Sequence, residues 1–231
     1  MARRCKICLV LGAGGVRGLS HLGVLQVLER EGIPIDYLVG TSAGSIVGAA
    51  YALEPDAMEI TRRALEYFGG EEFERSSFSA LIPDSRGPQP GLVQNVINGV
   101  RKGYVFSNLL RKQSILPGEK MSVMIDSLLP DLDFKDTKIP FAIPALDLKT
   151  GDDVLITRKS IRQAVIAGCA IPGFFPPVEY NDRLLTDSGI VCPVPVSVAQ
   201  KEFKPDVLIA VDILNRIEKE ENFPRGLDVL L

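Results

Sequence analysis

Residues 37–53 read YLVGTSAGSIVGAAYAL and contain the strongest structural motif of the chain. The apolar run at 37–40 predicts a short buried strand, and the small residues at 43–53 predict a helix. Between them lies Gly40-Thr41-Ser42-Ala43-Gly44, which matches the pattern G-x-S-x-G. A sharp strand-to-helix turn would expose the Ser42 hydroxyl, and the flanking glycines leave space for neighbouring backbone. The stretch therefore predicts that Ser42 is a nucleophile.

The start of the chain follows the same plan. Residues 6–11 predict a strand, Gly12 to Gly15 form a turn, and residues 16–31 predict a helix that stops at Gly32. Two successive strand-turn-helix units favour parallel strands joined by right-handed crossovers. In such a sheet the functional residues gather at the carboxyl ends of the strands. We therefore expect an α/β fold with its site at this edge.

The rest of the chain supplies further elements around a glycine- and proline-rich region. We expect one domain over residues 1–231, with a helical and loop insertion at about 69–129. A hairpin turn is predicted at 149–152, and Ser160 with Gln163 predicts a capped helix start. Helices are expected at 56–68, 92–101, 107–116, 120–129 and 160–170. Strands are expected at 141–148, 154–157, 178–180, 184–185 and 207–212.

Composition excludes several classes of protein. Hydrophobic residues make up 46% and charged residues 24% of the chain, with a formal net charge of −3, as in an ordinary globular protein. Basic residues are scattered in pairs, so we expect no nucleic-acid partner. No apolar stretch reaches the roughly 20 residues of a membrane span, and nothing resembles a signal peptide. We expect a cytoplasmic protein, with peripheral membrane contact left open and the oligomeric state unspecified.

The four cysteines give no clear metal site. Only Cys5 and Cys8 have metal-ligand spacing, and a zinc site needs more ligands than these two. Strand geometry places them on opposite faces, which favours small buried residues. We expect reduced thiols and no metal or organic cofactor.

The glycine-rich turn, Gly12-Ala13-Gly14-Gly15-Val16-Arg17-Gly18, reaches the same sheet edge as Ser42. Glycines let backbone N–H groups approach a tetrahedral oxyanion, so we expect an oxyanion hole. A phosphate-binding turn is the rival interpretation. Against it, Arg17 stands where the dinucleotide pattern G-x-G-x-x-G needs its third glycine. Arg17 would orient the loop or meet a lipid phosphate, with a purely structural ion pair as the alternative.

A serine nucleophile needs a base, and the chain holds one histidine, His21. His21 shares a helix face with Val24, Leu25 and Leu28, at i, i+3, i+4 and i+7. This pattern is typical of a buried, hydrogen-bonded core histidine. The base must then be a carboxylate.

Among the carboxylates, Asp187 is the strongest candidate for the base. It ends the short apolar run Leu184-Leu185-Thr186-Asp187, and Gly189 permits a tight turn after it. An aspartate that serves only as a helix cap or turn residue is the alternative that spacing leaves open.

Three separated motifs give the chain a resemblance to the patatin-like phospholipases. The glycine turn resembles the family's G-G-x-R/K-G element, residues 40–44 resemble its G-x-S-x-G elbow, and Asp187-Ser188-Gly189 resembles its D-G-G/A motif. Residues 170–177 resemble the loop that precedes the acid. The resemblance implies a three-layer sandwich with a central, mostly parallel sheet, and hydrolysis of lipid acyl esters. It also implies a Ser42–Asp187 dyad without histidine and an oxyanion hole from the N–H groups of Gly14 and Gly15.

One departure from the family pattern concerns Ser188, which replaces the usual glycine. If this position requires positive φ, serine would strain the turn by about 1 kcal/mol and shift Asp187. A catalytically weak binding or regulatory protein that keeps the fold is therefore the alternative function. Nucleotide binding at the glycine turn ranks last, because it gives Ser42 and Asp187 no role.

Overall fold

The computed structural model describes residues 4–74 and 114–214. The expected helix at 92–101, and most of the one at 107–116, lie outside these ranges. The described strands form one seven-stranded sheet. They are β1 (Ile7–Leu11), β2 (Tyr37–Gly40), β3 (Phe141–Asp147), β4 (Asp153–Ile156), β5 (Val178–Tyr180), β6 (Arg183–Asp187) and β7 (Val207–Val211).

The sheet has a parallel part and an antiparallel part, and β3 belongs to both. Its order is β5-β6-β3-β2-β1-β7, with β4 also paired to β3. Strands β7, β1, β2 and β3 run parallel, as the two strand-turn-helix units predict. Strands β4 and β6 run antiparallel to β3, and β5 runs antiparallel to β6. The sheet is therefore mixed, with four of its seven described strands parallel, and the expected α/β fold is confirmed.

Short turns explain two of the three antiparallel pairings. Strand β4 follows β3 through the predicted hairpin turn, where Gly151 has φ 77°. Strands β5 and β6 are joined by Asn181 and Asp182, which both have positive φ (49° and 65°). Two consecutive residues of positive φ suit a tight hairpin, and so short a connection allows only antiparallel pairing.

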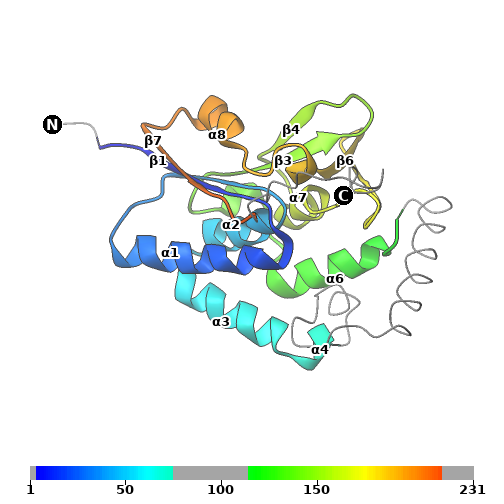
Figure 1. Ribbon diagram of the computed structural model, residues 1–231, viewed down its shortest axis with the longest axis horizontal. Helices are drawn as coiled ribbons and strands as arrows, with labels where there is room; N and C mark the ends of the chain where they lie inside the picture. The colour runs from blue at the N-terminus through cyan, green and yellow to red at the C-terminus, as the bar shows by residue number, and fades with distance from the viewer. Residues whose placement is uncertain (1–3, 75–113, 215–231) are drawn as a thin grey trace, which may run out of the picture.

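Helices cover both faces of the sheet (Figure 1). Leu9 and Leu11 of β1 pack with the helices on one face, whereas Cys8 and Val10 pack with α8 on the other. This alternation is the period-two pattern of a strand buried on both sides. The helices are α1 (Ser20–Arg30), α2 (Ala43–Leu53), α3 (Ala57–Phe68), α4 (Glu71–Glu74), α6 (Gly118–Leu128), α7 (Ile161–Gly168) and α8 (Val196–Phe203).

Several predicted helix boundaries agree with the structure, and two do not. The predicted cap at Ser160 is present, because its side chain accepts from the Gln163 amide, and Asp56 caps α3 in the same way by accepting from the Glu59 amide. The helix expected from residue 16 begins instead as a 3₁₀ turn, η1 (Gly15–Leu19), and becomes α-helical at α1. Residues 114–116 are not helical, because their backbone pairs with residues 173–174 and Pro117 follows.

Two expectations about the cysteines have different outcomes. Cys8 is buried as expected, and all four cysteines are free. Cys5 is exposed, because it precedes β1 and does not lie within the strand. Across residues 4–74 and 114–214, no three His, Cys, Asp or Glu side chains cluster to hold a metal ion. The same residues include no helix with the length and apolar character needed to cross a bilayer.

Candidate active site

Ser42 lies in a strained turn between β2 and α2. Its φ of 53° and ψ of −125° belong to a backbone region that residues with a side chain rarely adopt. The turn leaves no space at the flanking glycines. A Cβ on Gly40 would lie 2.3 Å from the Gly44 carbonyl oxygen, and one on Gly44 would lie 2.2 Å from that of Leu11. The G-x-S-x-G spacing is thus a steric requirement of this turn.

Two residues that the sequence analysis did not single out hold the Ser42 backbone. The Ser42 carbonyl oxygen accepts from the Ser45 amide at 2.8 Å, from Ser45 Oγ at 2.6 Å and from Cys169 Sγ at 3.2 Å. Burial and then the charge of Asp187 raise the pKa of the Cys169 thiol, so the sulfur keeps its proton as a donor. The role of Ser45 could have been predicted from the sequence, because it follows Ser42 by three residues in the same helical turn. The role of Cys169 could not, because this residue follows α7 and is far from Ser42 in the sequence.

Asp187 meets Ser42 from the opposite direction. It ends β6, which runs antiparallel to β3, and it pairs with Ala145, beyond the point where β2 stops. The aspartate is 2% exposed, and its carboxylate accepts a hydrogen bond from the Gly189 amide at 2.7 Å. Burial raises the pKa of Asp187 above its ordinary value, and the adjoining Ser42 side chain and the Gly189 amide oppose the rise. The structure therefore brings the two predicted residues together.

Ser188 does not strain the acid turn. It is absent from the described non-glycine residues with positive φ, and its buried hydroxyl donates to the Pro144 carbonyl at 3.1 Å. The condition for a shift of Asp187, a positive φ at Ser188, is therefore absent, and the turn continues as a short 3₁₀ helix, η4 (Ser188–Ile190). The position in this turn that has no room for a side chain is the next one, Gly189. A Cβ on Gly189 would lie 2.8 Å from Ala13 Cβ and 2.9 Å from the Asp187 carboxylate.

The glycine turn lies beside Ser42, as its place after β1 predicts. Gly15 has φ 55° and lines the same cavity as Ser42. Among the described residues, the Gly14 and Gly15 amides have no backbone acceptor outside the helices and strands. The side chain of Arg17 is exposed and forms no ion pair with a described residue. The described part of the chain therefore offers no partner for the structural ion pair that was the alternative role of Arg17.

His21 is a core residue. It is fully buried on α1, and its Nε2 lies 2.8 Å from the Gly12 carbonyl oxygen, to which it donates. Burial lowers the pKa of the imidazole, against the opposing effect of this hydrogen bond. The neutral imidazole ring of His21 thus hydrogen-bonds the first residue of the glycine turn and holds it against α1. This confirms the prediction of a buried, hydrogen-bonded histidine.

An apolar cavity of about 340 Å³ opens at Ser42. This volume lies within the usual range for small-molecule sites. Its walls come from η1, α2, α3, α4, α6 and the loop after α7, and include Ile46, Phe68, Phe73, Met121, Met124 and Phe175. The nucleophile candidate, the glycine turn and a buried carboxylate therefore surround a space suited to a hydrocarbon group.

Most of the chain matches a known protein family. The family model described as patatin-like phospholipase matches residues 9–199. The chain belongs to the patatin-like phospholipase family. The elbow, the acid turn and the glycine turn of this patatin-like domain all lie within the matched residues.

Relatives of the patatin-like domain are mostly much longer proteins. An uncharacterized NTE family protein of Mycobacterium tuberculosis is 32% identical over 93% of this chain and 31% of its own length. Lysophospholipase NTE1 of Candida glabrata is 30% identical over 90% of this chain and 10% of its own length. The chain thus spans a third or less of these two relatives. The crystal structure of VipD from Legionella pneumophila aligns with a TM-score of 0.48 and 16% identity, covering 82% of this chain and 47% of that one.

Proposed function

We propose that this protein is a lipid acyl hydrolase in which Ser42 is the nucleophile and Asp187 the base. The observation that carries the proposal is that the side chain of Ser42, held in a strained turn, adjoins the buried Asp187 carboxylate at the wall of an apolar cavity. A strained turn that presents a serine beside a base is typical of enzymes that form an acyl-enzyme intermediate. Membership of the patatin-like family and the lysophospholipase among the relatives support a lipid ester as substrate.

The proposed reaction has two halves. Asp187 accepts the Ser42 proton as Ser42 Oγ attacks the ester carbonyl, and the Gly14 and Gly15 amides donate to the oxyanion. Collapse of the tetrahedral intermediate breaks the ester bond, and Asp187 returns the proton to the leaving alkoxide. Water then attacks the acyl-enzyme with Asp187 as base, which releases the fatty acid and restores Ser42. Burial of Asp187 suits this role, because a raised pKa makes the carboxylate a stronger base.

The start of α2 adds to the stabilisation of the oxyanion. Ser42 is the residue before the first turn of this helix, whose N-terminal end carries partial positive charge. The negative charge that develops on the substrate oxygen therefore forms where the helix favours it.

Ester hydrolysis by matched variants tests the proposal. Ser42→Ala and Asp187→Asn should each lower kcat for nitrophenyl butyrate by about three orders of magnitude or more. Ser127→Ala and Asp126→Asn, which change exposed side chains of α6, should keep wild-type turnover. Full turnover in Ser42→Ala or in Asp187→Asn would refute the dyad.

A fluorophosphonate probe distinguishes the enzyme from a binding or regulatory protein with the same fold. The probe should label Ser42 in the wild type and label neither Ser42→Ala nor, at a comparable rate, Asp187→Asn. A wild-type protein that stays unlabelled while a known serine hydrolase reacts would favour the binding protein.

A further inference from the structure

A second apolar cavity lies next to the one at Ser42. Its volume is about 80 Å³, and it shares five lining residues with the larger cavity. The shared residues, Gly15, Val16, Ala43, Ile46 and Phe68, come from η1, α2 and α3. The two spaces therefore adjoin along a common wall, and we call the smaller one the distal chamber.

One face of α2 runs along both cavities. Ala43 and Ile46 line the two, and Ala50 lines only the distal chamber. These positions follow the i, i+3, i+7 spacing of a single helix face. The rise of an α-helix places Ala50 about 12 Å beyond Ser42 along the axis. An extended hydrocarbon chain bound at Ser42 thus has a continuous apolar surface along which to lie.

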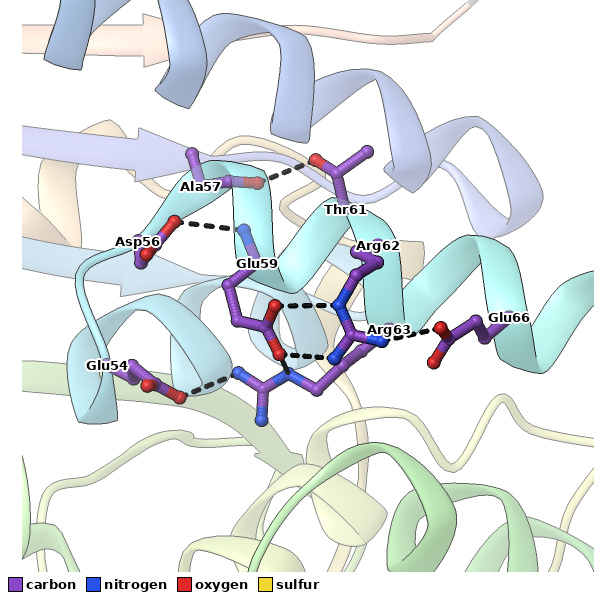
Figure 2. Close-up of polar contacts among 8 residues, drawn as sticks. All are labelled: Glu54, Asp56, Ala57, Glu59, Thr61, Arg62, Arg63 and Glu66. Atoms are coloured by element: carbon purple, nitrogen blue, oxygen red, sulfur yellow. Dashed lines mark hydrogen bonds and ion pairs between the residues drawn. The ribbon is translucent and has the colours of Figure 1, made fainter.

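Polar contacts fix the far wall of the distal chamber, which α3 provides. Arg63 joins Glu54, the residue after α2, at 2.8 Å, and Glu59 at 3.6 Å. Figure 2 shows this guanidinium between the two carboxylates. On the α1 side, Gln26 donates to Thr61 of α3 at 2.7 Å. The guanidinium of Arg63 is thus paired with carboxylates, although Arg63 lines the chamber, and the interior of the chamber stays apolar.

We propose that the distal chamber receives the far end of the substrate's acyl chain, and that Ala50 and Ala64 set the limit on chain length. The inference rests on the proposed function and makes it more specific, since it names the residues that limit the length of the acyl chain. Both alanines line the distal chamber and neither lines the cavity at Ser42. Their small side chains leave the volume that a larger residue would fill.

Burial of the acyl chain in the distal chamber should change the relative rates for long and short esters by a measurable factor. Each methylene that leaves water for an apolar wall improves binding roughly fourfold. Hydrolysis of nitrophenyl laurate should therefore exceed that of nitrophenyl butyrate in kcat/KM for the wild-type protein. The laurate-to-butyrate ratio of kcat/KM is the quantity to follow, because it cancels any general loss of active enzyme.

Filling the distal chamber should lower that ratio. In Ala50→Leu and Ala64→Leu we expect the ratio to fall about tenfold or more, since several methylenes lose their place. Leu65→Phe adds bulk on the solvent side of the same helix, where Leu65 is 65% exposed, and should leave the ratio unchanged. Ala50→Val and Ala64→Val provide smaller insertions if the leucine variants do not fold, and thermal unfolding identifies the folded ones.

The outcomes separate this inference from the proposed function. A wild-type enzyme that hydrolyses both esters, with a ratio unaltered by folded chamber variants, would overturn the inference and leave the dyad intact. An equal fall in Leu65→Phe would also overturn it, because the effect would then not come from the chamber. A wild-type protein that hydrolyses neither ester and resists the fluorophosphonate probe would overturn both.

Discussion

The turn that carries Ser42 and the turn that carries Asp187 are built in different ways. The Ser42 turn has a strained backbone, and its flanking glycines lie against main-chain atoms that cannot move aside. The Asp187 turn has ordinary dihedral angles (φ −60°), and burial and hydrogen bonds hold it in place. The comparison indicates that backbone sterics position the nucleophile, whereas polar contacts and desolvation tune the acid.

The largest effect should come from filling the space at Gly44. A Cβ there would lie 2.2 Å from the Leu11 carbonyl oxygen, and main chain cannot rotate away as a side chain can. We expect Gly44→Ala to lower the free energy of unfolding by about 3 kcal/mol or more, measured by urea denaturation.

Gly23→Ala is the matched control for this change. Gly23 lies in α1, and a Cβ added to it would meet no atom within 4 Å, so alanine should raise stability by about 0.5–1 kcal/mol. If both variants lose stability equally, the sterics of the elbow are not the cause.

The pH dependence tests the acid turn. Because burial raises the pKa of Asp187, the acidic limb of kcat/KM should have its midpoint above the ordinary value of 3.8. The raised pKa also means that the folded protein binds this proton more tightly than the unfolded chain. The contribution to stability is therefore fully present below the unfolded pKa and is lost as the pH rises through the folded pKa.

Asp187→Asn sharpens this test by removing the charge. The variant should be inactive yet at least as stable as the wild type at neutral pH, as measured by thermal unfolding. A midpoint at or below 3.8, or a strong loss of stability in Asp187→Asn, would mean that hydrogen bonding outweighs burial at this carboxylate.

The smallest effect should come from Ser188. Its hydroxyl contributes one hydrogen bond to the Pro144 carbonyl, so Ser188→Ala should lower stability by about 1 kcal/mol. Because the turn has no positive φ at this residue, kcat/KM should stay within about twofold of the wild type. A large fall in kcat/KM at unchanged KM would show that the hydroxyl helps to position Asp187.

The sequence predicted the Ser42 side of the site well because its determinants are local. The glycine spacing, the preceding strand and the small-residue helix lie within 37–53, and the observed α2 has the predicted ends. The face of His21 was also predictable, since helical spacing alone reveals it. Interactions between near neighbours in the chain are what such patterns record.

The Asp187 side was harder to predict because its determinants are distant in sequence. The motif marked the residue, but its direction of approach depends on β6 pairing antiparallel to β3, which no local pattern specifies. The contact between Cys169 and the Ser42 carbonyl joins residues far apart in the chain. Ser188 begins the 3₁₀ turn η4 and has no positive φ, so the condition under which serine would strain the turn is not met.

The contacts of strand β7 indicate where the chain could be truncated without breaking the fold. The family match ends at residue 199, yet the Val211 carbonyl accepts from the Gly12 amide and the Ile213 side chain packs against Gly14. A fragment cut at 199 would retain Ser42 and Asp187 but leave β1 with an open hydrogen-bonding edge, which invites pairing between molecules. The limits of sequence similarity therefore fall inside the cooperative folding unit, and residues through 213 belong with the glycine turn.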